Sequence, residues 1–167
     1  MKRGLEPIID KESRVLILGT LPGDVSLQYA QYYADSRNKF WTILSAVYEE
    51  TIPPDYPNRL RFLRKKRIAL WDVLHSANRR GSLDRDIKNA VPNDFSRLLR
   101  VHRNIAAIAL NGKRAWDLFS LHVQQQLTHE LERRPRLIRL PSTSGMPGKY
   151  ISSIDQKIDE WRVIASL

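Results

Sequence analysis

The sequence contains no cysteine. This absence excludes disulfide bonds, thiolate zinc sites, iron–sulfur clusters and cysteine nucleophiles. The chain also lacks any apolar run that approaches the ~18 residues needed to span a membrane. Its first residues contain no apolar segment of the kind found in signal peptides. We therefore expect a cytoplasmic protein that does not contact membranes.

Acidic residues are scarce relative to basic ones. The 167 residues include 18 Asp and Glu but 28 Lys and Arg, and the formal net charge is +10. Such an excess favours a polyanionic partner, most simply nucleic acid, although solubility alone could also explain it. Basic residues cluster at 59–67, 79–80 and 133–136, and we expect some of them to contact phosphates.

The order of apolar and amphipathic segments predicts one α/β domain over residues 1–167. Short apolar runs, typical of strands buried on both faces, lie at 14–19, 67–71, 105–110 and 136–140. Helices are expected at 40–47, 59–66, 94–99, 116–127 and 151–165. This alternation predicts a parallel sheet with helices on both faces. The segments 19–23 and 76–82, which contain turn-forming residues, are expected to be irregular.

The most unusual residues follow the predicted strands, at the edge of the sheet where such folds bind ligands. The motifs, in chain order, are Gly19-Thr-Leu-Pro-Gly-Asp-Val-Ser26, Gln31-Tyr-Tyr-Ala34, Asn38-Lys-Phe-Trp41, Leu70-Trp-Asp-Val73, Gly81-Ser-Leu-Asp84, Val91-Pro-Asn-Asp-Phe95, Asn111-Gly-Lys-Arg-Ala-Trp116 and Leu140-Pro-Ser-Thr-Ser144. With these motifs the chain resembles the uracil-DNA glycosylase superfamily from about Val15 to Ser144. Within that superfamily it is most similar to the hypoxanthine (deoxyinosine) DNA glycosylases.

The resemblance implies a three-layer α/β/α sandwich with a central four-stranded parallel sheet. It also implies an enzyme of base-excision repair. Such an enzyme flips a deaminated base out of double-stranded DNA and hydrolyses its N-glycosidic bond, without a metal or other cofactor. No lysine falls in a matched catalytic position. We therefore expect a monofunctional, monomeric glycosylase that leaves an abasic site.

Asn38 is the expected catalytic residue. In many members of the superfamily an Asp or Asn of the first motif positions the attacking water, but here that position is Leu21, which has no polar group. In the hypoxanthine branch the Asn of the Asn-x-Phe-Trp motif takes this role, which implies Asn38. A carboxamide orients water but is a poor base, so the implied mechanism is dissociative. On pattern alone, Asn38 could instead only cap the following helix.

The base-binding residues implied by the resemblance lie in three segments. Tyr33 and Phe40 are candidates to stack on the flipped base, although the spacing of Phe40 is also that of a core residue. The amide of Asn111 can pair with the O=C–N–H edge that hypoxanthine and uracil share, or Asn-Gly can simply form a turn. Backbone N–H groups of the first loop could bind the carbonyl oxygens of the base. The residues of that loop are Gly19, Thr20, Leu21 and Pro22.

The loop after the fourth apolar run is the expected DNA contact. Small hydroxyl residues there suit contacts with phosphates, and these residues are Ser142, Thr143 and Ser144. Met146 is a candidate wedge that fills the space left by the flipped base. Many relatives carry a histidine near this loop that stabilises the departing base, but none lies between Pro141 and Ile151. That stabilisation would then depend on backbone amides and neutral donors.

Three other functions remain open from the sequence. Uracil presents the same edge as hypoxanthine, so a mismatch uracil-DNA glycosylase of the same fold is the nearest alternative. Leu21 and the missing histidine are compatible with a non-catalytic binder of damaged DNA. An enzyme acting on free nucleotides is disfavoured by the net charge of +10 and by the lack of a Gly-x-x-x-x-Gly-Lys-Ser/Thr phosphate loop.

Overall fold

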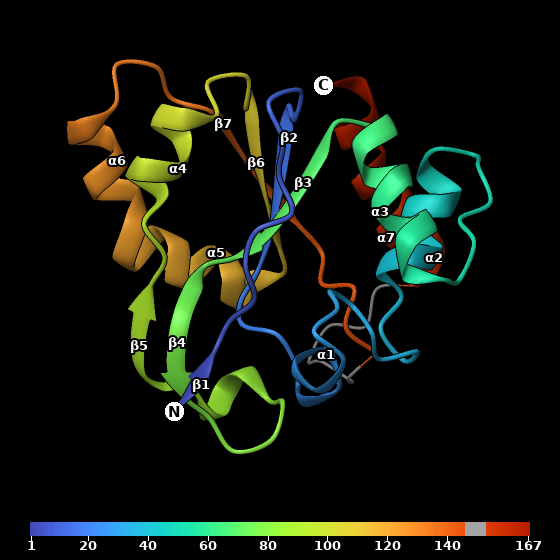
Figure 1. Cartoon of the computed structure of the whole chain (residues 1–167), viewed down its shortest axis with the longest axis horizontal. Coiled ribbons are helices and arrows are strands. Elements are labelled where there is room, and N and C mark those ends of the chain that lie inside the picture. Colours follow the sequence, from blue (N-terminus) through green and yellow to red (C-terminus); the bar gives the residue numbers. More distant parts are fainter. Residues whose placement is uncertain (146–152) are drawn as a thin grey trace.

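The structure is a computed structural model that describes residues 1–145 and 153–167 (Figure 1). At its centre is a four-stranded sheet with the strand order β3-β2-β6-β7, in which every neighbouring pair is parallel. The strands are β2 (Val15–Gly19), β3 (Ile68–Asp72), β6 (Ala107–Asn111) and β7 (Arg136–Leu140). They fall on the four apolar runs, so the α/β fold expected from the sequence is confirmed.

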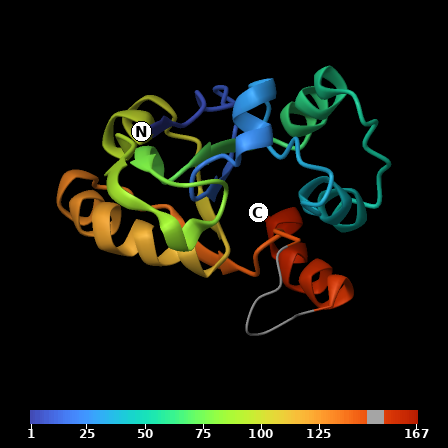
Figure 2. The same cartoon turned by 90° about the horizontal axis from the view of Figure 1, so that it is seen from below.

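Helices cover both faces of this sheet. On one face lie α2 (Phe40–Val47), α3 (Tyr56–Lys65), α7 (Ile154–Trp161) and η3 (Arg162–Ser166). On the other face lie α4 (Phe95–Val101), α5 (Lys113–Phe119), η2 (Ser120–Gln124) and α6 (Gln125–Glu130). Figure 2 shows the layers from below, with the red and teal helices on one side and the orange helices on the other. No helix in the described part of the chain is long and apolar enough to cross a membrane.

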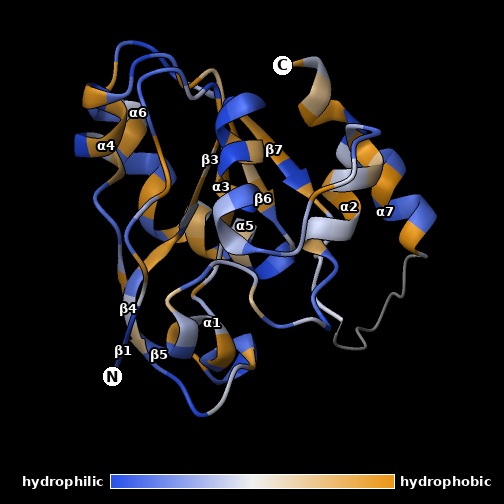
Figure 3. Ribbon diagram, turned by 45° about the vertical axis from the view of Figure 1, so that its right-hand side comes forward, coloured by the Kyte–Doolittle hydropathy of each residue, from blue (hydrophilic) through white to orange (hydrophobic). Residues whose placement is uncertain are grey.

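Successive strand residues pack into two different cores. Leu16 and Leu18 belong to the core shared with α4, α5 and α6, whereas Val15 and Ile17 belong to the core shared with α2, α3 and α7. All four are almost completely buried. Figure 3 shows the resulting hydrophobic colouring along the central strands. A strand buried on both faces has no polar alternation, which explains the continuous apolar runs of the sequence.

A second, antiparallel sheet was not expected from the sequence. Its strand order is β1-β4-β5, and its strands are β1 (Lys2–Arg3), β4 (Leu74–Asn78) and β5 (Lys88–Pro92). The expectation of an irregular segment at 76–82 is therefore wrong for residues 76–78. The sequence pattern also missed the short helix α1 (Asp24–Tyr29) and the 3₁₀ turn η1 (Asp84–Asp86). These elements are short and mix polar with small residues, so no hydrophobic period marks them.

Three residues stand side by side at the carboxyl end of the central sheet. Gly19 of β2 pairs with Asp72 of β3, and on the other side of β2 Asn111 of β6 directly follows Leu110, the partner of Leu18. The side chains of this row point to the face covered by α2 and α7, because Ile17, two positions earlier on β2, lies in that core. Asp72 and Asn111 therefore flank a position that has no side chain.

Candidate active site

Two of the predicted aromatic residues stack on each other near this row. Tyr33 has a left-handed backbone conformation with a φ of 53°. Its ring lies parallel to that of Phe40, with ring centroids 3.7 Å apart and an interplanar angle of 10°. Phe40 is fully buried and also packs edge-on against Trp41 and Trp161. Tyr33 is only partly buried, so Tyr33 is the ring that can offer a face to a base, and Phe40 supports it from the core.

Asn111 makes three hydrogen bonds at the end of β6. Its Nδ2 donates to the hydroxyl oxygen of Tyr33 at 3.1 Å and to Oγ1 of Thr143 at 2.9 Å. Its Oδ1 accepts from the backbone N–H of Thr143 at 3.0 Å. These bonds fix the plane of the amide and the identity of its oxygen. Both amide hydrogens are engaged, while Oδ1 keeps a second lone pair.

Asn38 lies just before α2 and is partly buried. Its Oδ1 accepts from the backbone N–H of Phe40 at 3.0 Å, so the side chain supports the first turn, although the N-cap position itself is Lys39. The N–H of Lys39 donates to the carbonyl of Thr143 at 2.9 Å, which ties this segment to the loop after β7. Apart from the bond to Phe40, the Nδ2 group and the second lone pair of Oδ1 are the parts of the amide that can orient a water.

The backbone carbonyl groups of the first loop, residues 19–22, all accept hydrogen bonds from the side of the loop where β4 and Arg79 lie. Those of residues 19–20 accept hydrogen bonds from the backbone N–H groups of residues 73–74. Those of Leu21 and Pro22 accept from the guanidinium of Arg79. In a trans peptide the N–H that follows a carbonyl points the opposite way, so the N–H groups of Thr20, Leu21 and Gly23 face away from β4 and Arg79. Pro22 has no N–H.

The side chains of the first loop contribute little to the site. Leu21 is 5% exposed and belongs to the core on the α4, α5 and α6 side. Thr20 and Pro22 are also buried. The position that carries a polar side chain in many relatives is therefore part of the packing here, and only the backbone of the loop is available to a ligand.

Arg79 is not available to a phosphate, which corrects its assignment to an exposed basic cluster. Its side chain has no exposed surface. Its guanidinium donates to the carbonyls of Leu21 and Gly81, each at 3.1 Å, and to a carboxylate oxygen of Asp84 at 3.4 Å. Arg79 thus joins the first loop to the turn before η1. The neighbouring Arg80 is exposed and stays a predicted phosphate contact.

Asp72 is a buried acid that sequence reasoning missed. It is 5% exposed, and its Oδ2 has no hydrogen-bond partner in the described part of the chain. Burial raises the pKa of Asp72 to about 8, with the carboxyl of Asp84 acting in the same direction and Arg79 opposing it. Burial also raises the pKa of Asp84 and that of the Tyr33 hydroxyl. The sequence signals for Asp72 are its position at the end of a buried strand and its place in the motif Leu70-Trp-Asp-Val73, neither of which gave it a role.

The predicted DNA contacts after β7 are separated by the fold. Ser142 is exposed and Ser144 partly buried, but Thr143 is fully buried. Because its hydroxyl accepts from Asn111, Thr143 is placed to orient that amide and not to reach a phosphate. Met146 lies outside the described residues. Within residues 1–145 and 153–167, no group of three or more His, Asp or Glu side chains is arranged to hold a metal ion.

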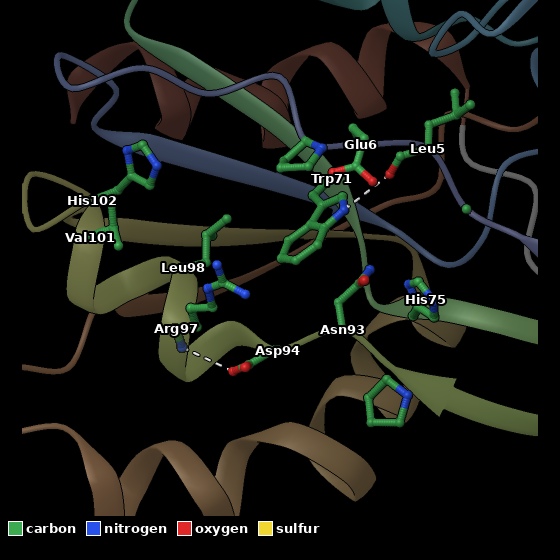
Figure 4. A pocket seen from close by; sticks show the side chains of 13 residues that line it. Leu5, Glu6, Trp71, His75, Asn93, Asp94, Arg97, Leu98, Val101 and His102 are labelled. Carbon is green, nitrogen blue, oxygen red and sulfur yellow. Dashed lines mark hydrogen bonds between the residues drawn. The ribbon is translucent and has the colours of Figure 1, made fainter.

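A separate cavity of about 520 Å³ lies beside β3 (Figure 4). Its lining includes Leu5, His75 and the indole of Trp71, which donates to the carbonyl of Leu5 at 3.2 Å. Trp71 and Asp72 are successive strand residues, so their side chains point to opposite faces of the sheet. None of the predicted site residues lines this cavity.

Comparison with known proteins settles the family. The sequence model of the Uracil DNA glycosylase superfamily matches residues 6–159. The chain belongs to this superfamily. The matched range contains the whole central sheet and every residue of the site described above, so the resemblance inferred from the motifs is confirmed for the uracil DNA glycosylase superfamily as a whole.

Two curated members of the superfamily are similar in sequence, and both are named Hypoxanthine DNA glycosylase. The protein from Methanosarcina barkeri is 40% identical over 117 residues, which cover 70% of this chain and 74% of the relative. The protein from Methanosarcina acetivorans is 37% identical over 165 residues, or 98% of each chain. Among solved structures, the NMR structure of a candidate uracil DNA glycosylase from Methanosarcina acetivorans has a TM-score of 0.80 and 29% identity, and covers 99% of this chain and 97% of that chain.

Proposed function

We propose that this member of the superfamily removes hypoxanthine from deoxyinosine in double-stranded DNA and leaves an abasic site. The observation that carries the proposal is the oriented amide of Asn111 beside the supported ring of Tyr33. The relatives at 40% and 37% identity are named for this activity. The enzyme acts as a monomer and needs no cofactor.

The base is held by stacking and by its Watson–Crick edge. One face of the hypoxanthine ring lies on Tyr33, whose other face is supported by Phe40 at 3.7 Å. The free lone pair of Asn111 Oδ1 accepts from N1–H of the base, and Nδ2 donates to O6 in exchange for the Tyr33 hydroxyl. Adenine carries an amino group and an unprotonated N1 at these atoms. Asn111 therefore rejects adenine, because two polar groups would be left without partners.

The bond breaks as positive charge develops on the sugar and negative charge on the base. Asn38 donates through Nδ2 to a water near C1′ and holds it on the line of attack. The backbone N–H groups of the first loop donate to the base as its charge increases. The attacking water reaches a cationic sugar, so little proton abstraction is needed, and a carboxamide suffices.

Duplex DNA binds through its phosphates at the same edge of the molecule. The net charge of +10 provides attraction that weakens steeply with salt. Ser142 and Ser144 contact the phosphates of the DNA backbone. Met146 fills the space that the flipped base leaves in the stack. Flipping costs a few kcal/mol and is easiest for a mismatched base, so a deoxyinosine opposite thymine, with which it forms only a wobble pair, is removed in preference to a normal purine.

Thr143→Val should slow excision of hypoxanthine by about 10-fold, which corresponds to about 1.4 kcal/mol. Valine keeps the shape of threonine but leaves one Nδ2 hydrogen of Asn111 without its acceptor, at a cost of about 1–3 kcal/mol. The measurement is the single-turnover rate on an inosine duplex. Thr128→Val is the matched control, because Thr128 is exposed and its hydroxyl donates to the backbone carbonyl of Gln124, one helical turn earlier. Equal losses in the two variants would contradict the role given to Thr143.

The proposed function is tested with end-labelled duplexes that contain inosine, uracil or xanthine at one position. Excision is detected by alkaline cleavage of the abasic product and by chromatography of the free base. We expect hypoxanthine release to exceed uracil release, and no strand cleavage without alkali. We also expect no enzyme–DNA adduct after borohydride treatment, because no lysine serves as nucleophile.

The remaining outcomes of this assay identify the alternatives. Faster release of uracil would assign a mismatch uracil-DNA glycosylase. Tight binding of the duplex without release of any base would assign a non-catalytic binder of damaged DNA. Either result would overturn the proposed substrate or the proposed activity.

A further inference from the structure

The row at the end of the central sheet brings an acid next to the proposed base site. A Cβ atom on Gly19 would lie 2.6 Å from Oδ1 of Asp72 and 3.5 Å from the hydroxyl oxygen of Tyr33. The carboxyl and the hydroxyl therefore meet over the same glycine. Asn111 of β6 directly follows Leu110, the partner of Leu18 on the other side of β2, so its backbone is about 10 Å, or two strand spacings, from that of Asp72. A base that displaces the Tyr33 hydroxyl from Asn111 would therefore have Asn111 at one end and the carboxyl of Asp72 at the other.

Within residues 1–145 and 153–167, the carboxyl of Asp72 has no partner at Oδ2 that would explain a buried acid. Its Oδ2 is buried without a hydrogen bond in the described residues. The titratable groups that face it are Asp84 of η1, Arg79 from the turn after β4, and the hydroxyls of Tyr32 and Tyr33. Burial outweighs the attraction of Arg79 and raises the pKa of Asp72 to about 8. The group is therefore a neutral acid at neutral pH, which can donate a hydrogen bond or a proton.

We infer that Asp72 is a catalytic residue that protonates an unsubstituted ring nitrogen, N3 or N7, of the departing purine. This inference rests on the proposed function. The C1′–N9 bond breaks and its electron pair passes to the purine, which takes the Asp72 proton and leaves as neutral hypoxanthine. The oxygen of water bonds to C1′ and releases a proton to solvent, and solvent reprotonates Asp72.

This assignment supplies what the chain otherwise lacks. No histidine lies between Pro141 and Ile151 to stabilise the departing base. An acid with a pKa near the working pH is well suited to donate a proton in the transition state. Uracil has no unsubstituted ring nitrogen, since its N1 bears the sugar and its N3 bears a hydrogen. Asp72 therefore favours the excision of purines. It distinguishes hypoxanthine from uracil, which present the same edge to Asn111.

The test measures single-turnover excision by the wild-type enzyme and Asp72→Asn on three duplexes. These contain deoxyinosine, 7-deaza-deoxyinosine or 3-deaza-deoxyinosine. Asn cannot transfer a proton, so we expect it to slow excision of hypoxanthine about 100-fold. On the analogue whose reacting nitrogen is replaced by C–H, the two enzymes should have equal rates. The wild-type rate should fall above about pH 8, and the rate of Asp72→Asn should not. Asp86→Asn, another acid of the same region, should behave as wild type.

Asp72→Asn should fold, because Asn resembles the neutral acid in shape and charge. The pKa of Asp72 is raised from 3.8 to about 8, so the folded state holds a proton that the unfolded state has lost. The stability contributed by this proton is present below about pH 4 and is lost as pH rises toward 8. The variant should therefore be at least as stable as wild type at pH 8 in a thermal melt.

Two results would overturn the assignment of Asp72 but leave the proposed function intact. One is an unchanged rate in Asp72→Asn. The other is the same slowing on all three duplexes, which would mean that Asp72 only shapes the site. A wild-type enzyme that releases no hypoxanthine from the deoxyinosine duplex would instead contradict the proposed function, and the assignment of Asp72 would fail with it.

Discussion

Replacement of Asn38 by alanine should slow hypoxanthine release by at least about 100-fold, or about 2.7 kcal/mol in the activation free energy. We assign the positioning of the attacking water to the Nδ2 group of Asn38, while its Oδ1 accepts from the N–H of Phe40 at 3.0 Å. Alanine removes both the amide group that positions the water and the oxygen that accepts from the N–H of Phe40. The measurement is the single-turnover rate on an inosine duplex at saturating enzyme, which separates the chemical step from product release.

Asn38→Ser distinguishes catalysis from helix capping. Serine is a good acceptor for N–H groups at the start of a helix, so it should recover the roughly 1 kcal/mol of stability that alanine loses there. Serine has no amide, so its excision rate should stay close to that of Asn38→Ala. If Asn38→Ser instead restored the rate to within about 5-fold of wild type, which is about 1 kcal/mol, the side chain would act through the start of α2 and not through water.

The central sheet was predictable because its strands carry their own signal. β2, β3, β6 and β7 are buried on both faces, and an uninterrupted apolar run of about five residues between turn-forming segments is typical of such strands. β4 has no such signal, since it alternates buried Leu74 and Ser76 with exposed His75 in a segment rich in small polar residues. Its strand character comes from pairing with β1, which is distant in sequence, and with β5 across the irregular connection 79–87. The antiparallel sheet was therefore missed.

The site shows the same division between local and tertiary information. Asn111, Tyr33 and Asn38 were candidates because each stands in a recognisable motif. The hydrogen bond between Asn111 and Tyr33, 78 residues apart, depends on how β6 meets the loop before α2, and no local pattern encodes it. Thr143 was predicted to contact phosphate because a hydroxyl in a loop is usually exposed. Its backbone and side chain both bond to Asn111, which is why it is buried.

Buried charge is the least predictable feature of this chain. Arg79 precedes Arg80, and in the sequence the pair resembles any exposed basic cluster. The structure separates them, since Arg79 is fully buried and Arg80 is exposed. Sequence reasoning assigns charged residues to the surface because they are almost never fully buried unless they are paired. The partners of Arg79 are mostly backbone carbonyls, which leave no trace in the sequence.

Arg79→Ala should lower the free energy of unfolding by about 3–5 kcal/mol, the cost of removing one member of a buried charged network. The carbonyls of Leu21, Pro22 and Gly81 would lose their donor. Asp84 would lose the positive charge that opposes the rise in its pKa. Urea unfolding at neutral pH measures the loss. Arg80→Ala is the matched control and should change stability by no more than about 0.5 kcal/mol, as exposed substitutions usually do.

The same substitution should also impair excision through the first loop. Arg79 holds the carbonyls of Leu21 and Pro22. The bond to Pro22 directs the N–H of Gly23 away from Arg79, whereas Pro22 itself has no N–H. Without the guanidinium the loop can turn, and backbone donors that must be preorganised for the base would be lost. We expect at least about a 10-fold slower single-turnover rate, or about 1.4 kcal/mol, at a temperature where the variant is still folded. Arg79→Lys keeps the charge but not the several donors of the guanidinium, so it should recover little of the rate. Full activity in Arg79→Lys would mean that charge alone, and not the hydrogen bonds to the loop, is what the site requires.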